Sequence, residues 1–475
     1  MKFLTKNAIA ILLVSSFLLL NSCEDPVLPV GNDADFTHFE FVYMLGNAKI
    51  DKTSKTIEAE INAIEDLSSL IPTFVLTQGA TAYINNVVQK SGISENDFST
   101  IVEYKIVSEN GATVNNWKVI IYQKYVPNDP INTTFVKNQM IYPGTYNLDG
   151  EIKIADSIYL GLQPGVKLIL GPNAKFIFGK DSRFVAKGNK DSTIIFTSET
   201  ADWSGFVFNN VDEAEFQYCK IENVGQTSSQ LMEINNSIIG ITNSVFNNIG
   251  CTGFVLNNSS TFRVFDYNTL NNVGSDAGQH PIVFYSINNA SNLGINNKIT
   301  NTDATKGILI KDALASNNIT LIGQDCPYVF EKDIECSSLA EITFFITNGV
   351  TIIMNEGKGI ALGCSKTLFK VEGTENSPVV IKGKENTPGF WRGITINKDV
   401  LAGSNITHCK ILNAGNDVNK GAICCDGTDE VKLKIQNCYI AHTKSNGIYF
   451  KKGATATLIK NTFENIGLED YYYEQ

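Results

Sequence analysis

The feature that most limits how this chain can fold is a long stretch that occurs twice, with the same internal order. The first copy spans residues 165–225 and the second spans 349–415. Matching glycines lie 184 positions apart at the start of the two copies and 190 positions apart at the end, a difference that loop insertions can absorb. Self-similarity of this kind is typical of repeat proteins, in which one structural unit stacks on the next.

Each copy is a series of short apolar runs, five to seven residues long and rich in Val, Ile and Phe, such as 166–170 and 192–196. Gly, Asn, Asp and Ser separate the runs, and this pattern predicts strands rather than helices. A shorter Asn-x-Gly signature recurs downstream at 223–225, 248–250 and 272–274, in steps of 25 and 24 residues. A strand-rich repeat of this length indicates a parallel β-solenoid.

These residues resemble the right-handed parallel β-helix proteins of the pectate-lyase-like type. The resemblance rests on 165–225, on its copy 349–415, and on the segment 461–467, which ends in the same signature. It implies an all-β chain with a single-stranded right-handed parallel β-helix over residues 127–475, and the tail 471–473 is expected to cap its last coil. The family includes polysaccharide lyases, hydrolases, epimerases and surface proteins of unassigned chemistry, so the resemblance defines a fold and not an activity.

The amino end has the features of an export signal over residues 1–22, with Lys2 and Lys6 before an apolar core. The run Leu20-Asn21-Ser22-Cys23 resembles the lipobox of bacterial lipoproteins, which implies lipid attachment at Cys23. The alternative is an ordinary secretory signal followed by an unrelated cysteine. Acidic residues directly after Cys23 resemble the tag that sends some lipoproteins of Gram-negative bacteria to the cell surface. The expected location is therefore the outer membrane, with residues 23–35 as an extended tether.

Residues 36–126 alternate apolar and polar side chains, with turns about every ten residues, and this predicts a small antiparallel β-sandwich. The stretch is similar to the immunoglobulin-like modules near the anchor of many surface lipoproteins. Segments 70–76, 89–92 and 97–98, together with Tyr104, carry that likeness. The expected role is a spacer, and the prolines at 127–130 are expected to mark the boundary with the β-helix.

Charge and cysteine content limit the partners. A net charge of -11 disfavours nucleic acid, which attracts basic surfaces. Three arginines among 38 basic residues make an acidic polysaccharide a less favoured ligand, because arginine grips carboxylates at two points. Nine of the ten cysteines remain once Cys23 is lipidated; Cys219 and Cys409 occupy equivalent places in the two copies and are expected to pack as small apolar groups. A disulfide between Cys326 and Cys336 is left open.

No catalytic motif of the lyases or hydrolases is found, so no catalytic residue is assigned. The histidines at positions 38, 280, 408 and 442 are expected to be structural or surface residues. Acid clusters at 212–215, 331–335 and 426–430 lie in predicted turns. Calcium is a weaker possibility there, since carboxylates on turns can bind it, and no other cofactor is expected.

The candidate carbohydrate-binding residues are Trp203, Trp391 and Arg392. The two tryptophans open the matching strands Trp-Ser-Gly-Phe and Trp-Arg-Gly-Ile. An exposed indole offers a flat apolar face on which a sugar ring can stack. The alternative is that this tryptophan is a core residue of the repeat, because it recurs at the same place in both copies.

These features predict a lipid-anchored surface protein whose β-helix serves as a non-catalytic glycan-binding or adhesion module. The partners would be a polysaccharide or surface glycan and, through the lipid, the membrane. The alternative is a polysaccharide lyase or glycoside hydrolase of the same superfamily. Binding predicts aromatic and amide side chains in a shallow groove, whereas catalysis predicts Asp, Glu, Lys or His gathered on adjacent coils of one face.

Overall fold

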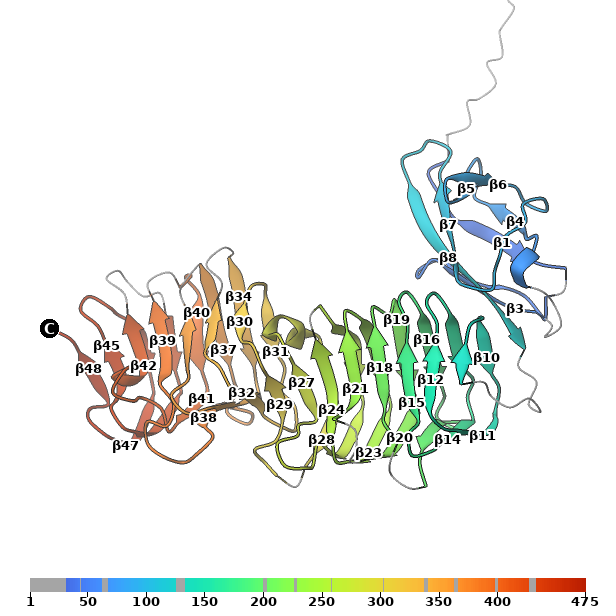
Figure 1. The fold of residues 1–475 in the computed structure, drawn as a ribbon. Helices are drawn as coiled ribbons and strands as arrows, with labels where there is room; N and C mark the ends of the chain where they lie inside the picture. The colour runs from blue at the N-terminus through green and yellow to red at the C-terminus, as the bar shows by residue number, and fades with distance from the viewer. Residues whose placement is uncertain are drawn as a thin grey trace, which may run out of the picture.

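The computed structural model shows a small β domain followed by a long β-solenoid (Figure 1). It describes residues 31–475 apart from 43, 62–66, 125–132, 200–202, 226–228, 258, 302, 337–340, 363–365, 398–399 and 427–432. The expected export signal, Cys23 and the prolines at 127–130 lie outside the described residues. Among the residues described, no helix is both long enough and apolar enough to span a bilayer.

The N-terminal domain has two sheets. β1 (Phe36–Glu40) pairs antiparallel with β4 (Thr73–Leu76). The second sheet contains the remaining strands: β2 (Lys49–Asp51), β3 (Thr56–Ile61), β5 (Thr81–Ile84), β6 (Val87–Gln89), β7 (Val102–Val107) and β8 (Val114–Lys124). A short 3-10 helix, η1 (Leu67–Ser69), precedes β4. The expected all-antiparallel sandwich is wrong at one place, since β3 and β8 are parallel. The chain between them crosses to the other sheet and returns, so both strands run the same way.

The core of this domain is aromatic. The ring of Phe36 meets those of Phe39, Phe74, Tyr104 and Trp117 edge to face, with centroids 5.4–5.6 Å apart. Edge-to-face contacts of this kind add to the stabilisation that burial itself gives. The two strands of the smaller sheet are thereby fixed to the larger one.

In the solenoid, every strand pairs in parallel with the strand one coil away, which confirms the predicted parallel β-solenoid. The longest face, here called the long sheet, has 14 strands and runs through both halves. Its strands are β9 (Thr134–Phe135), β12 (Glu151–Ile154), β15 (Lys175–Phe178), β18 (Phe206–Asn209), β21 (Gln230–Asn235), β24 (Thr252–Asn257), β27 (Ile282–Phe284), β29 (Ile308–Ile310), β32 (Tyr328–Phe330), β35 (Thr351–Met354), β38 (Val379–Gly383), β41 (Cys409–Leu412), β44 (Tyr439–Thr443) and β47 (Thr462–Ile466).

Two further sheets complete the first half. The junction sheet continues the larger sheet of the N-terminal domain into the solenoid through β10 (Gln139–Ile141), β13 (Tyr159–Leu162), β16 (Arg183–Lys187), β19 (Glu213–Gln217), β22 (Ile238–Thr242) and β25 (Thr261–Asp266). The other sheet holds β11 (Gly144–Leu148), β14 (Val166–Leu170), β17 (Ile194–Thr197), β20 (Cys219–Val224), β23 (Val245–Ile249), β26 (Thr269–Val273) and β28 (Lys298–Thr300).

The second half has its own pair of sheets beside the long sheet. One, here called the tyrosine sheet, ends in three tyrosines and holds β30 (Leu314–Ala315), β33 (Ile334–Cys336), β36 (Gly359–Leu362), β39 (Gly393–Asn397), β42 (Gly421–Asp426), β45 (Asn446–Phe450) and β48 (Tyr471–Tyr473). The other holds β31 (Ile319–Leu321), β34 (Ile342–Thr347), β37 (Thr367–Glu372), β40 (Ser404–Thr407), β43 (Leu433–Gln436) and β46 (Thr457–Ile459).

Inward side chains stack coil on coil. Phe178 lies on Phe208 with ring centroids 4.7 Å apart and planes 7° apart. The asparagine of the repeated signature has a left-handed backbone, with φ of 59° at Asn223, 53° at Asn248 and 62° at Asn413. Asparagine tolerates that conformation better than most residues, because its short polar side chain bonds locally. The signature therefore marks a corner of the coil.

The two copies of the repeat do not use the same faces. The strand after Trp203, β18, belongs to the long sheet, whereas its counterpart after Trp391, β39, belongs to the tyrosine sheet. Between the copies, the 3-10 helix η2 (Ile287–Asn292) stands in the chain where the next strand of the junction sheet would follow β27. Equivalent surfaces of the two copies therefore face different sides of the solenoid.

A partly buried ion-pair cluster joins the two domains. Arg183 on β16 has a side chain only 7% exposed; it donates from Nε to Glu213 at 2.8 Å and from Nη1 to Glu58 on β3 at 3.0 Å. Its guanidinium lies 5.7 Å from the ring centroid of Tyr159. Because Glu58 belongs to the N-terminal domain, this cluster fixes that domain against the first coils.

Candidate functional site

The repeated Trp-x-Gly motif builds the inside of the coil. Trp203 and Trp391 are both fully buried. The indole Nε1 of Trp203 donates to the carbonyl oxygen of Glu222 at 3.2 Å, and that of Trp391 donates to Leu412 at 2.9 Å. Neither ring is available to a ligand, so the expected stacking role of the two tryptophans is wrong. The alternative, a recurring core residue, agrees with the structure.

A steric constraint explains why glycine occupies the third position of the Trp-x-Gly motif. Gly393 has φ of +104°, and a Cβ there would lie 2.5 Å from the carbonyl oxygen of Ala422. In the first copy, a Cβ on Gly205 would lie 2.1 Å from the carbonyl oxygen of Leu231. The two copies therefore share Trp and Gly for packing and differ at the intervening residue, which is Ser204 in one and Arg392 in the other.

Arg392 is the one member of the expected carbohydrate-binding set that reaches a surface depression. Its guanidinium forms an ion pair with Asp333, whose Oδ1 also accepts the backbone N–H of Gly359 at 2.8 Å. A Cβ on Gly359 would lie 3.3 Å from Nε of Arg392, so glycine lets the side chain lie flat on β36. Among the described residues, the buried Nε of Arg392 has no hydrogen-bond partner.

The depression beside Arg392 is a groove of about 340 Å³ on the outer face of the tyrosine sheet. Small outward side chains form its floor: Ala361 on β36, Thr395 on β39 and Cys424 on β42 are in register on successive coils. Tyr449 on β45 follows in the same row. These strands lie side by side at the carboxyl end of the solenoid (Figure 1). Small residues between larger ones leave a hollow, and the volume lies at the small end of the range for ligand sites.

Paired charges line the sides of the groove. Lys451 forms an ion pair with Asp426, and Lys420 lies 3.8 Å from Glu474. The phenol of Tyr449 donates to Glu474 at 2.8 Å. Together with Arg392 and Asp333, three cations face three carboxylates, so the charges around the groove balance.

Neutral polar groups lie between these pairs. Thr395 donates from Oγ1 to the amide oxygen of Asn419 at 2.6 Å, and the amide nitrogen of Asn419 donates to the carbonyl of Gly421 at 3.0 Å. The thiol of Cys424 is nearly buried, and that burial raises its pKa to about 11. It is therefore protonated near neutral pH and is a floor residue rather than a nucleophile.

An exposed aromatic ring extends the floor. Tyr472 on β48 is in register with Tyr449 and lies on it with ring centroids 5.4 Å apart and planes 8° apart. Its side chain is 38% exposed. The tail was expected only to cap the last coil, and there the ring of Tyr473 stacks on that of Phe450 with centroids 4.5 Å apart. The spacing offered a signal for Tyr472, which follows Tyr449 by 23 residues, about one coil.

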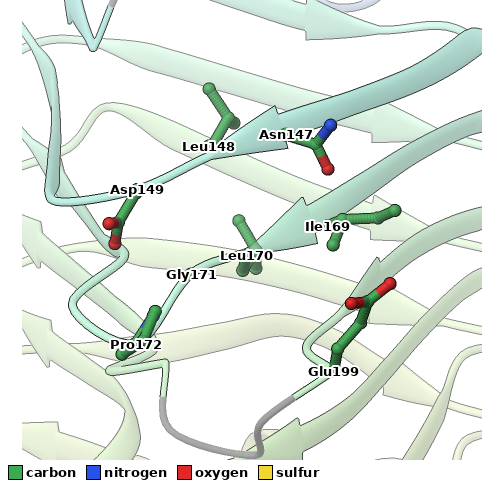
Figure 2. Close-up of a pocket in the computed structure, with 8 residues that line it drawn as sticks. All are labelled: Asn147, Leu148, Asp149, Ile169, Leu170, Gly171, Pro172 and Glu199. Atoms are coloured by element: carbon green, nitrogen blue, oxygen red, sulfur yellow. The ribbon is translucent and has the colours of Figure 1, made fainter.

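Besides a depression of about 160 Å³ lined by Lys175, Gln230 and Glu233, two further depressions among the described residues are smaller than the groove. One of about 250 Å³ lies where β11 and β14 end, with Asp149 and Glu199 on separate loops around aliphatic side chains (Figure 2). Asp149 accepts the backbone N–H of Gly150 at 2.8 Å, so it also holds its own turn. The other, of about 140 Å³, contains His280.

The acid clusters expected as calcium sites are occupied by ion pairs. Glu213 pairs with Arg183, Glu331 with Lys311 at 2.9 Å, and Asp426 with Lys451. In the described parts of the chain, no three carboxylate, histidine or cysteine side chains gather as a metal site. Residues 427–430 of the third cluster lie outside them.

The remaining histidines lie away from the groove, and the remaining cysteines that the structure describes are buried. His38 pairs with Glu40 at 3.1 Å on the N-terminal domain, and His408 and His442 contact Asn437 and Asn465. Cys326 and Cys336 are both buried, and no disulfide joins them. Cys219 and Cys409 are buried, as expected of small apolar residues.

Fold and site together define a β-solenoid with a shallow, charge-balanced groove and an aromatic edge, carried behind a small β domain. Residues 36–121 match the family described as "SGBP, N-terminal", the N-terminal domain of surface glycan-binding proteins. This match covers the N-terminal domain alone. It contains no part of the groove.

Two solved structures are distantly similar to this chain. A protein of Bacteroides thetaiotaomicron described as a candidate glycoside hydrolase is 23% identical over 20% of this chain and 26% of its own, with a TM-score of 0.17. The family 28 exopolygalacturonase of Yersinia enterocolitica is 9% identical over 86% of this chain and 97% of its own, with a TM-score of 0.20. No curated protein matches the sequence.

Proposed function

We propose that this chain is a surface glycan-binding protein, lipidated at Cys23 and held on the outer membrane, which binds glycan in the groove of the tyrosine sheet. The family match of residues 36–121 supports the class, because it is made to domains of surface glycan-binding proteins. The lipobox-like sequence before Cys23 supports the anchor.

The observation that carries the proposed site is the position of Tyr472. Its exposed ring continues the row of Thr395, Cys424 and Tyr449, so a stacked pair of aromatic rings follows the polar hollow at one end. Sugar rings have an apolar face and a hydroxylated edge. Tyr472 suits the face, and the ion-paired side chains along the groove suit the hydroxyls, which both donate and accept hydrogen bonds.

The balance of charge indicates a neutral glycan. Each cation at the groove already faces a carboxylate: Arg392 faces Asp333, Lys451 faces Asp426, and Lys420 faces Glu474. A uronic acid would have to displace one of these carboxylates to gain a cation, whereas a neutral sugar can hydrogen-bond to both members of a pair.

A glycan array probed with the chain from Cys23 onward, lacking the acyl groups, tests the proposal. Neutral oligosaccharides are expected to bind, and Arg392→Ala with Tyr472→Ala is expected to abolish the signal. Lys153→Ala, which changes an exposed pair with Glu151 far from the groove, is the matched control. Binding confined to uronic acids, or neutral binding that survives the double change, would refute the groove. The enzymatic alternative is tested by incubating each bound glycan with the protein and measuring new reducing ends. No new reducing ends are expected.

A further inference from the structure

A second depression, on the outer face of the long sheet, combines polar side chains from several coils. Its volume is about 140 Å³. The lining comes from the turns before β27 and β29 and from the ends of β32, β35 and β38. Its polar members are Gln279, His280, Asp303, Thr305, Lys306, Glu331, Asn355 and Lys384. It lies on a different sheet from the groove.

His280 is held with one ring nitrogen turned to the protein. Its Nδ1 lies 3.1 Å from the carbonyl oxygen of Gly307. A carbonyl only accepts, so Nδ1 carries the proton, and Nε2 of the neutral ring is an acceptor. Burial lowers the pKa of His280, which keeps the ring neutral at pH 7. Within the part of the chain that the structure describes, Nε2 has no hydrogen-bond partner.

The charged side chains that line the depression differ in how many contacts they already make with the protein. Lys306 donates to the carbonyls of Ser275 at 2.6 Å, Gly274 at 3.2 Å and Asp276. Asp303 accepts the backbone N–H of Thr305 at 2.8 Å.

Glu331 is likewise engaged, in an ion pair with Lys311 at 2.9 Å. Lys384, by contrast, forms no ion pair among the described residues. His280 and Lys384 are therefore an acceptor and a donor left for a ligand.

The floor of this depression is apolar. Val329 lines it and belongs to an outward row of aliphatic side chains on the long sheet, with Val283, Leu309 and Ile353. An aliphatic floor with a few convergent polar groups is the usual composition of a small-molecule site.

We propose that this depression is a second saccharide site, which holds a single neutral sugar residue with one hydroxyl donating to Nε2 of His280 and another accepting from Lys384. The size of the cavity limits the ligand to about one ring. A neutral ligand fits better than an anion, because Asp303 and Glu331 stand on the same walls as Lys384. The proposal rests on the proposed function only in taking the ligand to be a sugar.

The test uses the whole chain from Cys23 onward and methyl β-D-glucopyranoside, methyl β-D-galactopyranoside and methyl α-D-mannopyranoside as probes in saturation-transfer NMR. His280→Asn places an amide nitrogen where Nδ1 donates, so the hydrogen bond to the carbonyl of Gly307 is kept. The same change removes Nε2, the proposed acceptor for the ligand. This variant and Lys384→Met are expected to weaken binding of at least one probe tenfold or more. Lys410→Met on the neighbouring β41 is the matched control and is expected to bind as the unaltered chain does.

Two further measurements keep the result interpretable. In the unaltered protein, the bound probe is expected to slow modification of His280 by diethyl pyrocarbonate, measured by mass spectrometry. Titration to a pH below the lowered pKa of His280 is expected to weaken binding, because protonated Nε2 cannot accept a hydrogen bond. Glu331, Asp303, Lys306, Lys311 and Lys384 are the charged groups around the ring.

The double variant Arg392→Ala with Tyr472→Ala is expected to bind the probe at the His280 depression as the unaltered chain does. A failure of the proposed groove can therefore be told apart from a failure of this second site. Probe binding unchanged in both His280→Asn and Lys384→Met, or no probe binding to any form, would overturn the proposal.

Discussion

The ring of Tyr472 lies parallel to that of Tyr449, with centroids 5.4 Å apart and planes 8° apart, on the last two coils of the tyrosine sheet. Tyr449 is buried beneath it and Tyr472 is exposed. The ring that could receive a sugar is thus supported from behind by a second ring, which limits its movement before a ligand arrives.

Tyr472→Ala is expected to weaken glycan binding about tenfold, because aromatic contacts contribute about 0.5–1.5 kcal/mol beyond burial and 1.4 kcal/mol is tenfold in affinity. Tyr473→Ala removes the neighbouring ring, which is in register with the inward Phe450, and is expected to leave affinity within twofold. Titration calorimetry with an array-selected glycan measures both. Equal losses in the two variants would mean that the tail supports the fold without contacting the ligand.

Arg183→Met is expected to lower the free energy of unfolding by about 3 kcal/mol, because it leaves Glu58 partly buried without its cation and leaves Glu213 paired with Arg263 alone. Urea unfolding followed by tryptophan fluorescence measures the change. Lys153→Met breaks an exposed pair with Glu151 and is expected to cost no more than about 0.5 kcal/mol. If the two variants were equally stable, the domains would not depend on this cluster.

Gly393→Ala is expected to destabilise the solenoid by about 3 kcal/mol or more, since a Cβ there meets the carbonyl of Ala422 in a left-handed backbone. Gly357 supplies the comparison: its φ is +66°, but a Cβ on it meets nothing within 4 Å. Gly357→Ala is therefore expected to cost only about 1–2 kcal/mol. Thermal unfolding of the two variants measures the difference. A lower melting temperature for Gly357→Ala than for Gly393→Ala would contradict the steric explanation.

Alkaline pH is expected to destabilise the protein. Burial raises the pKa of Cys251 and Cys326 to about 12 and that of Cys438 to about 11, from an ordinary value of 9.0. Below pH 9 the thiols are protonated in both states. Above it they ionise first in the unfolded chain, so stability falls by up to about 1.4 kcal/mol per pH unit for each thiol. The midpoints of urea unfolding at pH 7.5, 9 and 10.5, with a reductant present, measure this loss of stability. Equal midpoints at the three pH values would contradict the prediction.

Cys23→Ser is expected to move the protein from the membrane fraction to the soluble fraction, because the acyl chains can no longer be attached. Fractionation followed by intact-mass measurement checks both the location and the missing lipid mass. Cys219→Ser, at a buried position of the solenoid, is the control and should stay in the membrane. A Cys23→Ser protein that remained membrane-bound would show that the anchor lies elsewhere.

The sequence predicted the solenoid because strand length and turn residues are local properties. The signature asparagine is an example: the left-handed corner at Asn223 depends on the residue itself. The strand direction of β3 relative to β8 could not be predicted in the same way, because it depends on how the intervening chain crosses between sheets.

The site was harder to predict, since it depends on which way side chains point. Trp391 and Arg392 are adjacent, yet one is buried and the other reaches the groove. Because η2 stands where the next strand of the junction sheet would follow, the strands of the second copy belong to other sheets than those of the first. No residue of the repeat itself indicates this change. Trp203 and Trp391 could therefore not form one site, even though their motifs match.

Hydroxyl-radical footprinting with an array-selected neutral glycan tests the central claim most directly. Val418, 75% exposed, lines the groove and Tyr472 continues its floor, while Val87 and Ile93, 64% and 68% exposed, lie on the N-terminal domain. The glycan is expected to lower oxidation of Val418 and Tyr472 and to leave Val87 and Ile93 unchanged. Protection on the N-terminal domain, with Val418 and Tyr472 still fully reactive, would show that the tyrosine sheet does not bind the glycan.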